Sequence, residues 1–272
     1  MSNIVEIPHG MLNFNLIENA PRVGKYEIPK LKKTTAVAYE AVPFSEIGTE
    51  KGKKQKETDK WVHFFIHDKQ FDRIWSEPEK YLSVLKKYKG VISTDFSMYT
   101  PFTFTMQLWN VHRNRTIAYW LQQNGIEVIP NVRWGGIKTF DFCFDGIEKG
   151  GTVAIGTNGC ISNRVDRIDF KNGLAEMMRQ IEPETVVVYG TMPIDIFGKY
   201  LEKGDTTFVR IPHRFVTLVA AKAAAKSEDD IAKDSKGYEV AELLEDETLG
   251  DVILETGNLN DVVLDTESEV SR

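Results

Sequence analysis

Short apolar runs rich in β-branched and aromatic residues alternate with longer amphipathic stretches, and this alternation constrains the fold more than any other feature. The runs predict a first strand at 35–42 and further strands at 61–66, 90–93, 127–132, 152–155, 185–189 and 207–211. The stretches between them predict helices near 69–88, 102–124, 165–182, 193–202 and 214–226. Apolar strands that alternate with helices are typical of a parallel sheet. We therefore predict an α/β fold with a mainly parallel sheet flanked by helices.

Two topologies fit seven strands between residues 35 and 211. One is an open, doubly wound sheet, and the other is an incomplete (β/α) barrel. Each crossover between parallel strands should be right-handed in both. Periodicity does not separate the two, and we prefer the doubly wound sheet.

Local signals predict several helix boundaries. Thr100 and Pro101 resemble an N-cap followed by proline at the first helical position. Asn124 and Gly125 resemble a left-handed helix stop, and Pro183 should end the helix that begins near Val165.

Residue composition and charge divide the chain into three parts. Residues 1–34 are an irregular N-terminal segment, residues 35–227 are the α/β domain with a lysine-rich loop at 48–60, and residues 228–272 are an acidic tail that we expect to be disordered. The tail has fifteen acidic and three basic residues, a charge of −12. Because the whole chain carries −6, residues 1–227 must carry +6. The chain is a basic body with an acidic tail.

Several classes of protein do not fit the sequence. Two cysteines, Cys143 and Cys160, are too few to staple a fold of this size, so a reducing compartment and a cytoplasmic location are expected. No apolar run is long enough for a membrane span, and the N-terminus does not resemble a signal peptide. Walker, nucleophile-elbow, zinc-protease and kinase motifs are absent, and no metal site is expected. No cofactor is indicated.

Polar residues that follow the predicted strands form the candidate site. Ligands of parallel sheets bind beyond the carboxyl ends of the strands. Asp95 and Arg133 are the candidate catalytic residues. Asp95 is either a general base or the cap of the next helix, and Arg133 either binds a phosphate or pairs with Asp95. The candidate ligand-binding residues are Ser97, Tyr99, Asn131, Trp134, Thr157 and Asn158.

Basic residues at two places are candidates for contact with nucleic acid. Lys53, Lys54 and Lys56 belong to the lysine-rich loop. This loop is either an arm that contacts phosphates or only a solvated excursion from the domain. Arg113 and Arg115 lie in the predicted helix 102–124, where they face either phosphates or buried partners.

About half of the chain, from Trp61 to about Gly190, resembles a known family. The resemblance lies in four strings: STDFS at 93–97, NRTIAYW at 114–120, GIEVIPNVRW at 125–134 and FDFCFDG at 140–146. They resemble a domain-of-unknown-function family found in bacterial phages, plasmids and other mobile elements. The resemblance implies a genomic context and an intracellular location, but no activity.

These observations support two hypotheses. The first is a phage or mobile-element accessory protein, a binding module whose basic body contacts nucleic acid or a protein partner and whose acidic tail regulates or docks. The tail repeats at 251–256 and 261–266 each place three apolar residues between carboxylates, which suits docking to a protein partner. The alternative is an enzyme that acts on a phosphorylated small molecule or nucleotide at the strand ends. From the sequence we favour the first.

Overall fold

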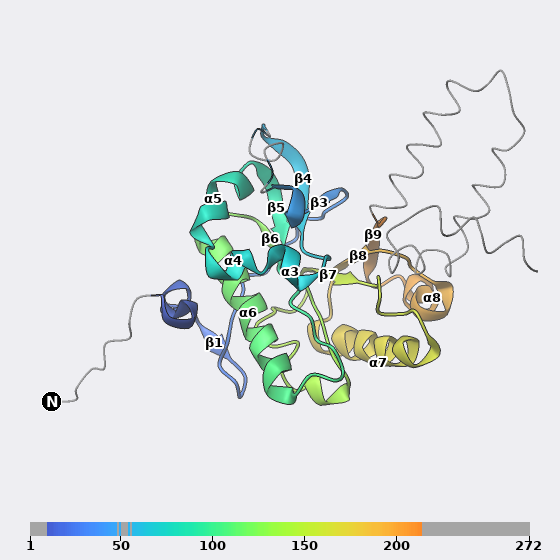
Figure 1. The fold of residues 1–272 in the computed structure, drawn as a ribbon. Coiled ribbons are helices and arrows are strands. Elements are labelled where there is room, and N and C mark those ends of the chain that lie inside the picture. The colour runs from blue at the N-terminus through green and yellow to red at the C-terminus, as the bar shows by residue number, and fades with distance from the viewer. Residues whose placement is uncertain (1–9, 48, 50–53, 55, 214–272) are drawn as a thin grey trace, which may run out of the picture.

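The computed structural model describes residues 10–47, 49, 54 and 56–213, and seven parallel strands form its framework (Figure 1). Four strands pair in the order β3 (Ala41–Pro43), β4 (Thr58–His63), β5 (Tyr88–Ile92) and β6 (Val128–Ile129). Three more pair in the order β7 (Thr152–Gly156), β8 (Thr185–Tyr189) and β9 (Thr207–Ile211). An isolated parallel bridge between Asn131 and Ala154 joins the two sheets edge to edge. The predicted α/β fold with mainly parallel strands is confirmed.

The winding of the strands differs from the one we preferred. The parallel strands follow the chain order, and no strand order reverses in either sheet. A doubly wound sheet needs such a reversal, so the observed order corrects that preference. The order is that of the alternative, an incomplete (β/α) barrel, and the described strands form no closed barrel.

The two faces of this sheet bury different side chains. One cluster, which we call the inner face, takes one residue or more from each strand between β4 and β9 and none from a helix: Trp61, Ile92, Ile129, Ala154, Val187, Tyr189 and Ile211, with Ala38. The rings of His63 on β4 and Tyr189 on β8 are 4.3 Å apart between centroids, although three strands lie between them. The sheet is therefore curved, and its inner face closes on itself.

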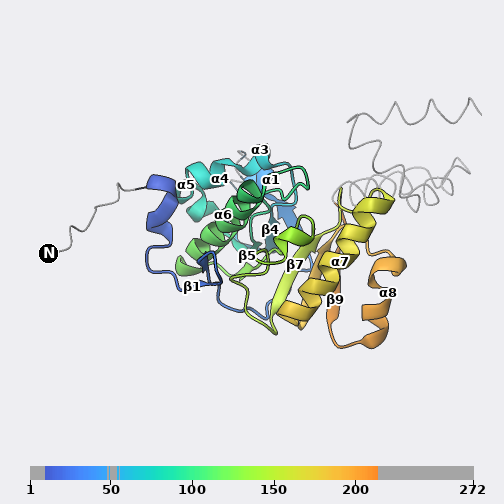
Figure 2. The ribbon, with the colours of Figure 1, turned by 90° about the horizontal axis from the view of Figure 1, so that it is seen from below.

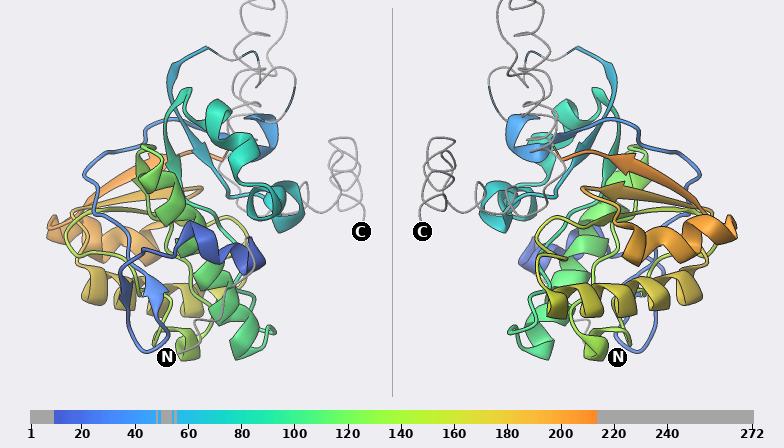
Figure 3. Two further views of the ribbon diagram at one scale, coloured as in Figure 1. Left: turned by 90° about the vertical axis from the view of Figure 1, so that its left-hand side faces the viewer. Right: turned by 90° about the vertical axis from the view of Figure 1, so that its right-hand side faces the viewer.

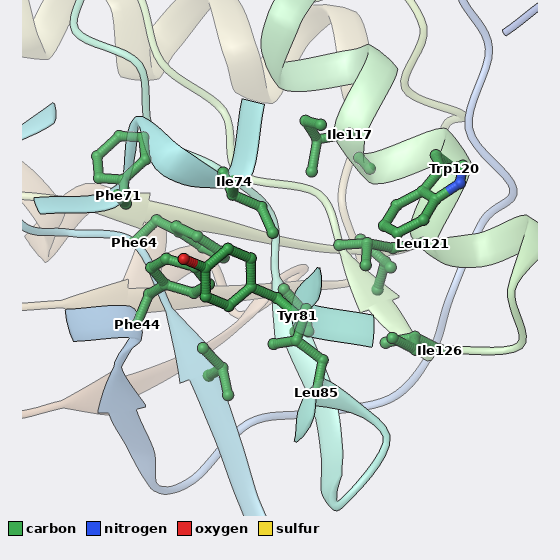
Figure 4. Close-up of a cluster of buried hydrophobic side chains, with 14 of the residues drawn as sticks. Phe44, Phe64, Phe71, Ile74, Tyr81, Leu85, Ile117, Trp120, Leu121 and Ile126 are labelled. Carbon is green, nitrogen blue, oxygen red and sulfur yellow. The ribbon is translucent and has the colours of Figure 1, made fainter. Parts of the chain in front are cut away.

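Helices cover the outer face in two groups. The first packs over β4 to β6 and contains α1 (Phe44–Ile47), α3 (Asp68–Phe71), α4 (Arg73–Ser76), α5 (Glu79–Leu85) and the C-terminal half of α6 (Phe104–Gln123). Figure 4 shows this core, which contains Phe44, Phe64 and Phe71 together with Ile117 and Leu121 of α6. The second group, α7 (Arg164–Ile181) and α8 (Ile194–Lys203), packs over β7 to β9 (Figure 2).

The N-terminal part packs on α6. It contains η1 (Met11–Leu16) and a small antiparallel hairpin, β1 (Arg22–Val23) and β2 (Ile28–Pro29). The Tyr119 hydroxyl on α6 donates to the Asn19 carbonyl at 3.3 Å, and η1 lies against α6 in Figure 3. A further short helix, η2 (Ile137–Thr139), precedes the turn that leads to β7.

Local signals placed some boundaries correctly and missed others. Helix α6 ends at Gln123 with Asn124 as its C-cap, and Gly125 has a φ of 77°, so the predicted helix stop is confirmed. The start of α6 was predicted wrongly, because Thr103 rather than Thr100 is the N-cap and its hydroxyl accepts from the Met106 amide. The first strand covers only Ala41–Pro43, and the single helix predicted at 69–88 is three short helices.

Several predictions fall outside the described residues. They are the helix at 214–226, Lys53, the acidic tail at 228–272 and the repeats at 251–256 and 261–266. Among the helices that are described, none is both long and apolar enough to span a membrane.

Candidate functional site at the carboxyl ends of the strands

A cavity of about 320 Å³ lies at the carboxyl ends of the central strands. Four segments line it: the loop after β5, the segment after β6, the end of β7 with the loop that follows, and the first half of α7. The lining residues are Met98, Tyr99, Thr100, Pro101, Val132, Arg133, Trp134, Gly135, Gly156, Gly159, Cys160, Asp166, Asp169 and Phe170. Parallel α/β folds place ligand sites at this edge of the sheet.

Arg133 is the cationic residue of the cavity wall, and Asp95 holds it in place. Its Nη1 donates to Asp95 Oδ2 at 2.9 Å, and Asn131 Nδ2 donates to Asp95 Oδ1 at 2.7 Å. The Asp95 side chain is 7% exposed, whereas that of Arg133 is 21% exposed. Asp95 therefore lies behind Arg133, and the guanidinium is both fixed and open to the cavity. The predicted pairing with Asp95 is therefore observed, and Arg133 also lies at the mouth of the cavity.

Burial and charge act in opposite directions on this pair. Burial raises the pKa of the Asp95 carboxyl, while Arg133 and the hydrogen bond from Asn131 lower it, and the net shift is upward. Burial lowers the pKa of Arg133, but the attraction of Asp95 outweighs it and raises the pKa overall. Arg133 is therefore a permanent cation at the site.

Two aromatic side chains predicted as ligand contacts do line the cavity. Tyr99 is 49% exposed at the rim. Trp134 forms a wall, since its ring packs against Phe170 of α7 at 5.1 Å between centroids. Gly173 makes this packing feasible, because a Cβ there would lie 2.1 Å from Trp134 Nε1.

Sequence reasoning missed the residues that reach the cavity from the α7 side, namely Cys160, Asp166 and Asp169. The sequence did contain a signal for Asp166 and Asp169, namely the residue that caps α7. Asn163 caps α7, since its Oδ1 accepts from the Val165 and Asp166 amides at 2.9 and 3.0 Å. That cap fixes the start of the helix and hence the residues of its first turns. Burial raises the pKa of the Cys160 thiol, and Arg133 opposes the rise.

Four other predicted ligand-binding residues do not line the cavity. Ser97 donates through its amide and hydroxyl to Asp68, at 3.1 and 2.7 Å. The Thr157 hydroxyl donates to the Thr191 carbonyl at 2.9 Å. Asn131 supports Asp95 from behind, and Asn158 is exposed outside the cavity. Asp95 does not cap α6, because the N-cap of that helix is Thr103.

Comparison with known proteins places the chain in a family. Residues 20–210 match a family described as a domain of unknown function (DUF4417). The chain belongs to this family. The match includes every residue that lines the cavity, and it confirms the resemblance to a phage-associated family.

Two proteins that are similar to the chain come from mycobacteriophages. The chain is 44% identical to the "Gene 1 protein" of Mycobacterium phage L5 over 132 residues, which are 48% of this chain and 57% of the relative. It is 36% identical to the "Gene 1 protein" of Mycobacterium phage D29 over 184 residues, which are 65% of each. The chain thus spans less than two thirds of either relative. No solved structure matches the chain.

The two arginines predicted to contact nucleic acid differ in burial, since Arg115 is buried and Arg113 is half-buried. Arg115 is 2% exposed, and it donates to the carbonyls of Asp145, Asn131 and Cys143 at 2.9, 3.2 and 2.8 Å. Arg113 pairs with Asp72 at 3.2 Å, and its guanidinium lies 3.6 Å from the Phe96 ring centre. These contacts correct the prediction for Arg115, which has no surface left for a phosphate.

The lysine-rich loop is only partly described. Lys54 and Lys56 are exposed between α1 and β4. Over the described part of the chain, no three His, Cys, Asp or Glu side chains are placed to hold a metal ion.

Proposed function

We propose that this chain is a cytoplasmic phage accessory protein that acts on a phosphorylated small molecule or nucleotide in the cavity at the strand ends. One observation supports this most strongly: Arg133 is a permanent, fixed cation on the wall of that cavity. The phage relatives support the genomic context.

The guanidinium suits a phosphate. It has five N–H donors in a rigid fork that matches phosphate oxygens, and the bond to Asp95 uses one nitrogen. Asp95 does not line the cavity, so we assign it a positioning role that acts through Arg133. A fixed guanidinium loses little side-chain entropy when it binds an anion.

The other walls suit the remainder of such a ligand. Tyr99 and Trp134 offer aromatic surfaces for a base or a sugar ring, and the carboxylates of Asp166 and Asp169 can accept hydrogen bonds from hydroxyl groups. A volume of about 320 Å³ is at the lower end for ligand pockets, which favours a mononucleotide or a sugar phosphate over a larger cofactor.

Thermal unfolding with a panel of nucleotides, sugar phosphates and inorganic phosphate tests this function. We expect at least one member to raise the Tm of the wild type by about 5–10 °C at a hundredfold excess over its Kd. Arg133→Gln should abolish that shift. The matched control is Arg179→Gln, which also breaks an arginine–carboxylate pair but does so on the surface of α7 with Glu176. Equal shifts in wild type and Arg133→Gln, or no shift with any member, would contradict the proposal.

A second candidate is contact with nucleic acid through the lysine-rich loop. Exposed Lys54 and Lys56, together with the +6 charge of residues 1–227, favour it. Removing residues 228–272 should then tighten binding of DNA or RNA, with a steep salt dependence, and Lys54→Gln with Lys56→Gln should weaken it. Binding that is unchanged by both alterations would exclude this function.

The tail repeats remain proposed docking segments for a protein partner. Changing Val252, Ile253 and Leu254, together with Val262, Val263 and Leu264, to serine keeps every charge but removes the apolar anchors. Capture of a partner should fail with this variant, whereas undiminished capture would show that the repeats do not dock.

A further inference from the structure

Three buried polar atoms at the carboxyl ends of neighbouring strands have no hydrogen-bond partner among the described residues. They are His63 Nε2, Thr94 Oγ1 and Asn131 Oδ1. The three residues are 1%, 0% and 1% exposed. Buried polar atoms in folded proteins nearly always have a partner, which is often an ordered water molecule. This cluster therefore indicates a bound group.

The strand register brings the three side chains together on the inner face. Side chains alternate between the faces of a strand, so His63 shares the face of Trp61 on β4. Thr94 and Asn131 each come two residues after a strand-end member of the same cluster, Ile92 of β5 and Ile129 of β6. Ile92 pairs with Ile129 across β5 and β6, and two residues further on Thr94 lies beside Asn131.

Two observations support this placement. The amide Nδ2 of Asn131 donates to the Thr94 carbonyl at 3.3 Å. On the other side of β5, Val62 pairs with Val91, which puts His63 beside Ile92 and diagonal to Thr94.

The hydrogen bonds already made define what each atom offers. His63 Nδ1 accepts from the Phe65 amide at 3.2 Å, so Nε2 carries the ring proton and donates. Burial, with the nearby His213, lowers the pKa of His63 to about 3, which keeps the ring neutral. Asn131 Nδ2 donates to Asp95 and to the Thr94 carbonyl, so its Oδ1 remains as an acceptor. A protonated Nε2 cannot bind a metal ion, so the bound group must itself accept and donate hydrogen bonds.

We propose that His63, Thr94 and Asn131 bind one hydroxyl oxygen on the inner face, supplied by a buried water molecule or by an alcohol group of a ligand. Such an oxygen has two lone pairs, which accept from His63 Nε2 and the Thr94 hydroxyl, and a hydrogen, which it donates to Asn131 Oδ1. Asn131 also holds Asp95, and Asp95 holds Arg133. The hydroxyl site thus supports the placement of the guanidinium from the inner face, but it does not depend on what the cavity at the strand ends binds.

The pair Thr94→Ser and Thr94→Ala tests the site, because these variants differ only in the hydroxyl oxygen. If the hydroxyl has a partner, Thr94→Ser should unfold about 2–4 °C above Thr94→Ala, which corresponds to one hydrogen bond in a domain of this size. If the hydroxyl is buried without a partner, the order reverses, and the proposal is wrong.

Wild-type protein gives an independent test and separates the two sources. In NMR spectra, the His63 Hε2 proton should show a cross-relaxation peak to a long-lived water molecule if water fills the site. If an alcohol fills it, ribose or inositol should raise the Tm of Thr94→Ser more than that of Thr94→Ala. Absence of the water contact together with equal polyol shifts would overturn the proposal. Arg133→Gln leaves these atoms in place, so failure of the phosphate site is distinguishable from failure of this one.

Discussion

Replacing Arg115 with methionine should destabilise the protein strongly, because this side chain is a structural donor in the interior. Methionine keeps an unbranched apolar side chain but removes three hydrogen bonds, those to the carbonyls of Asn131, Cys143 and Asp145. Each bond from a charged donor contributes about 1.5–3 kcal/mol, or about 4.5–9 kcal/mol for three.

The buried charge offsets part of that contribution. Burial lowers the pKa of Arg115 from its ordinary value to about 10, and each unit of that shift corresponds to about 1.4 kcal/mol, so the offset is about 3.5 kcal/mol. We therefore expect Arg115→Met to lower the free energy of unfolding by about 3 kcal/mol.

Urea unfolding at neutral pH measures this loss. The control is Arg179→Met, which removes an exposed arginine paired with Glu176 on α7 and should leave the free energy of unfolding unchanged. A loss below about 1 kcal/mol for Arg115→Met would refute the reasoning. A folded Arg115→Met that binds nucleic acid less tightly, with a smaller salt dependence, would restore the original prediction for this residue.

Three further predictions concern pH, the site and the tail. The pKa of His63 is about 3 in the folded protein and near its ordinary 6.5 when unfolded, so the unfolded state takes up the proton first. Stability should fall by up to about 1.4 kcal/mol per pH unit as the pH drops from 6.5 towards 3, and His63→Leu should remove that part of the slope. If urea unfolding gives His63→Leu the same pH dependence of the free energy of unfolding as the wild type, this prediction is wrong. Asp95→Asn should stay folded in circular dichroism but lose most of the ligand-induced Tm shift, because the guanidinium of Arg133 is no longer held; a full shift would refute the positioning role. Removal of residues 228–272 should change the Tm by less than about 5 °C, and a larger loss would show that the tail packs.

Strand positions could be predicted from the sequence where polar residues bound a short apolar run on both sides. Strands β8 and β9 were predicted residue for residue, since Thr185–Tyr189 and Thr207–Ile211 are short β-branched runs. The segment 69–88 was harder, because its apolar spacing continues across the breaks that divide it. Pro78 lies inside this segment and becomes the N-cap of α5, a position that proline tolerates.

Strand order could not be predicted, because periodicity reports the face of each strand but not its neighbours. The rule that ligand sites lie beyond the carboxyl ends of parallel strands did select Asp95, Asn131 and Arg133. These residues follow the adjacent strands β5 and β6, and their side chains are in contact. Cys160 was not predictable, since its position depends on the path of the loop after β7. The role of Arg115 was predicted wrongly because α6 is buried on most of its surface, where this arginine donates to backbone carbonyls instead of facing solvent.

The rate at which a thiol reagent labels Cys160 tests the central claim most directly. Cys160 lines the cavity beside Arg133, and the chain has one other cysteine, Cys143, which is fully buried. A phosphorylated ligand that raises the Tm should slow the labelling of Cys160 in the wild type, with half-maximal protection at its Kd. Labelling of Cys160 at an unchanged rate while that ligand is bound would place the ligand elsewhere and contradict the account.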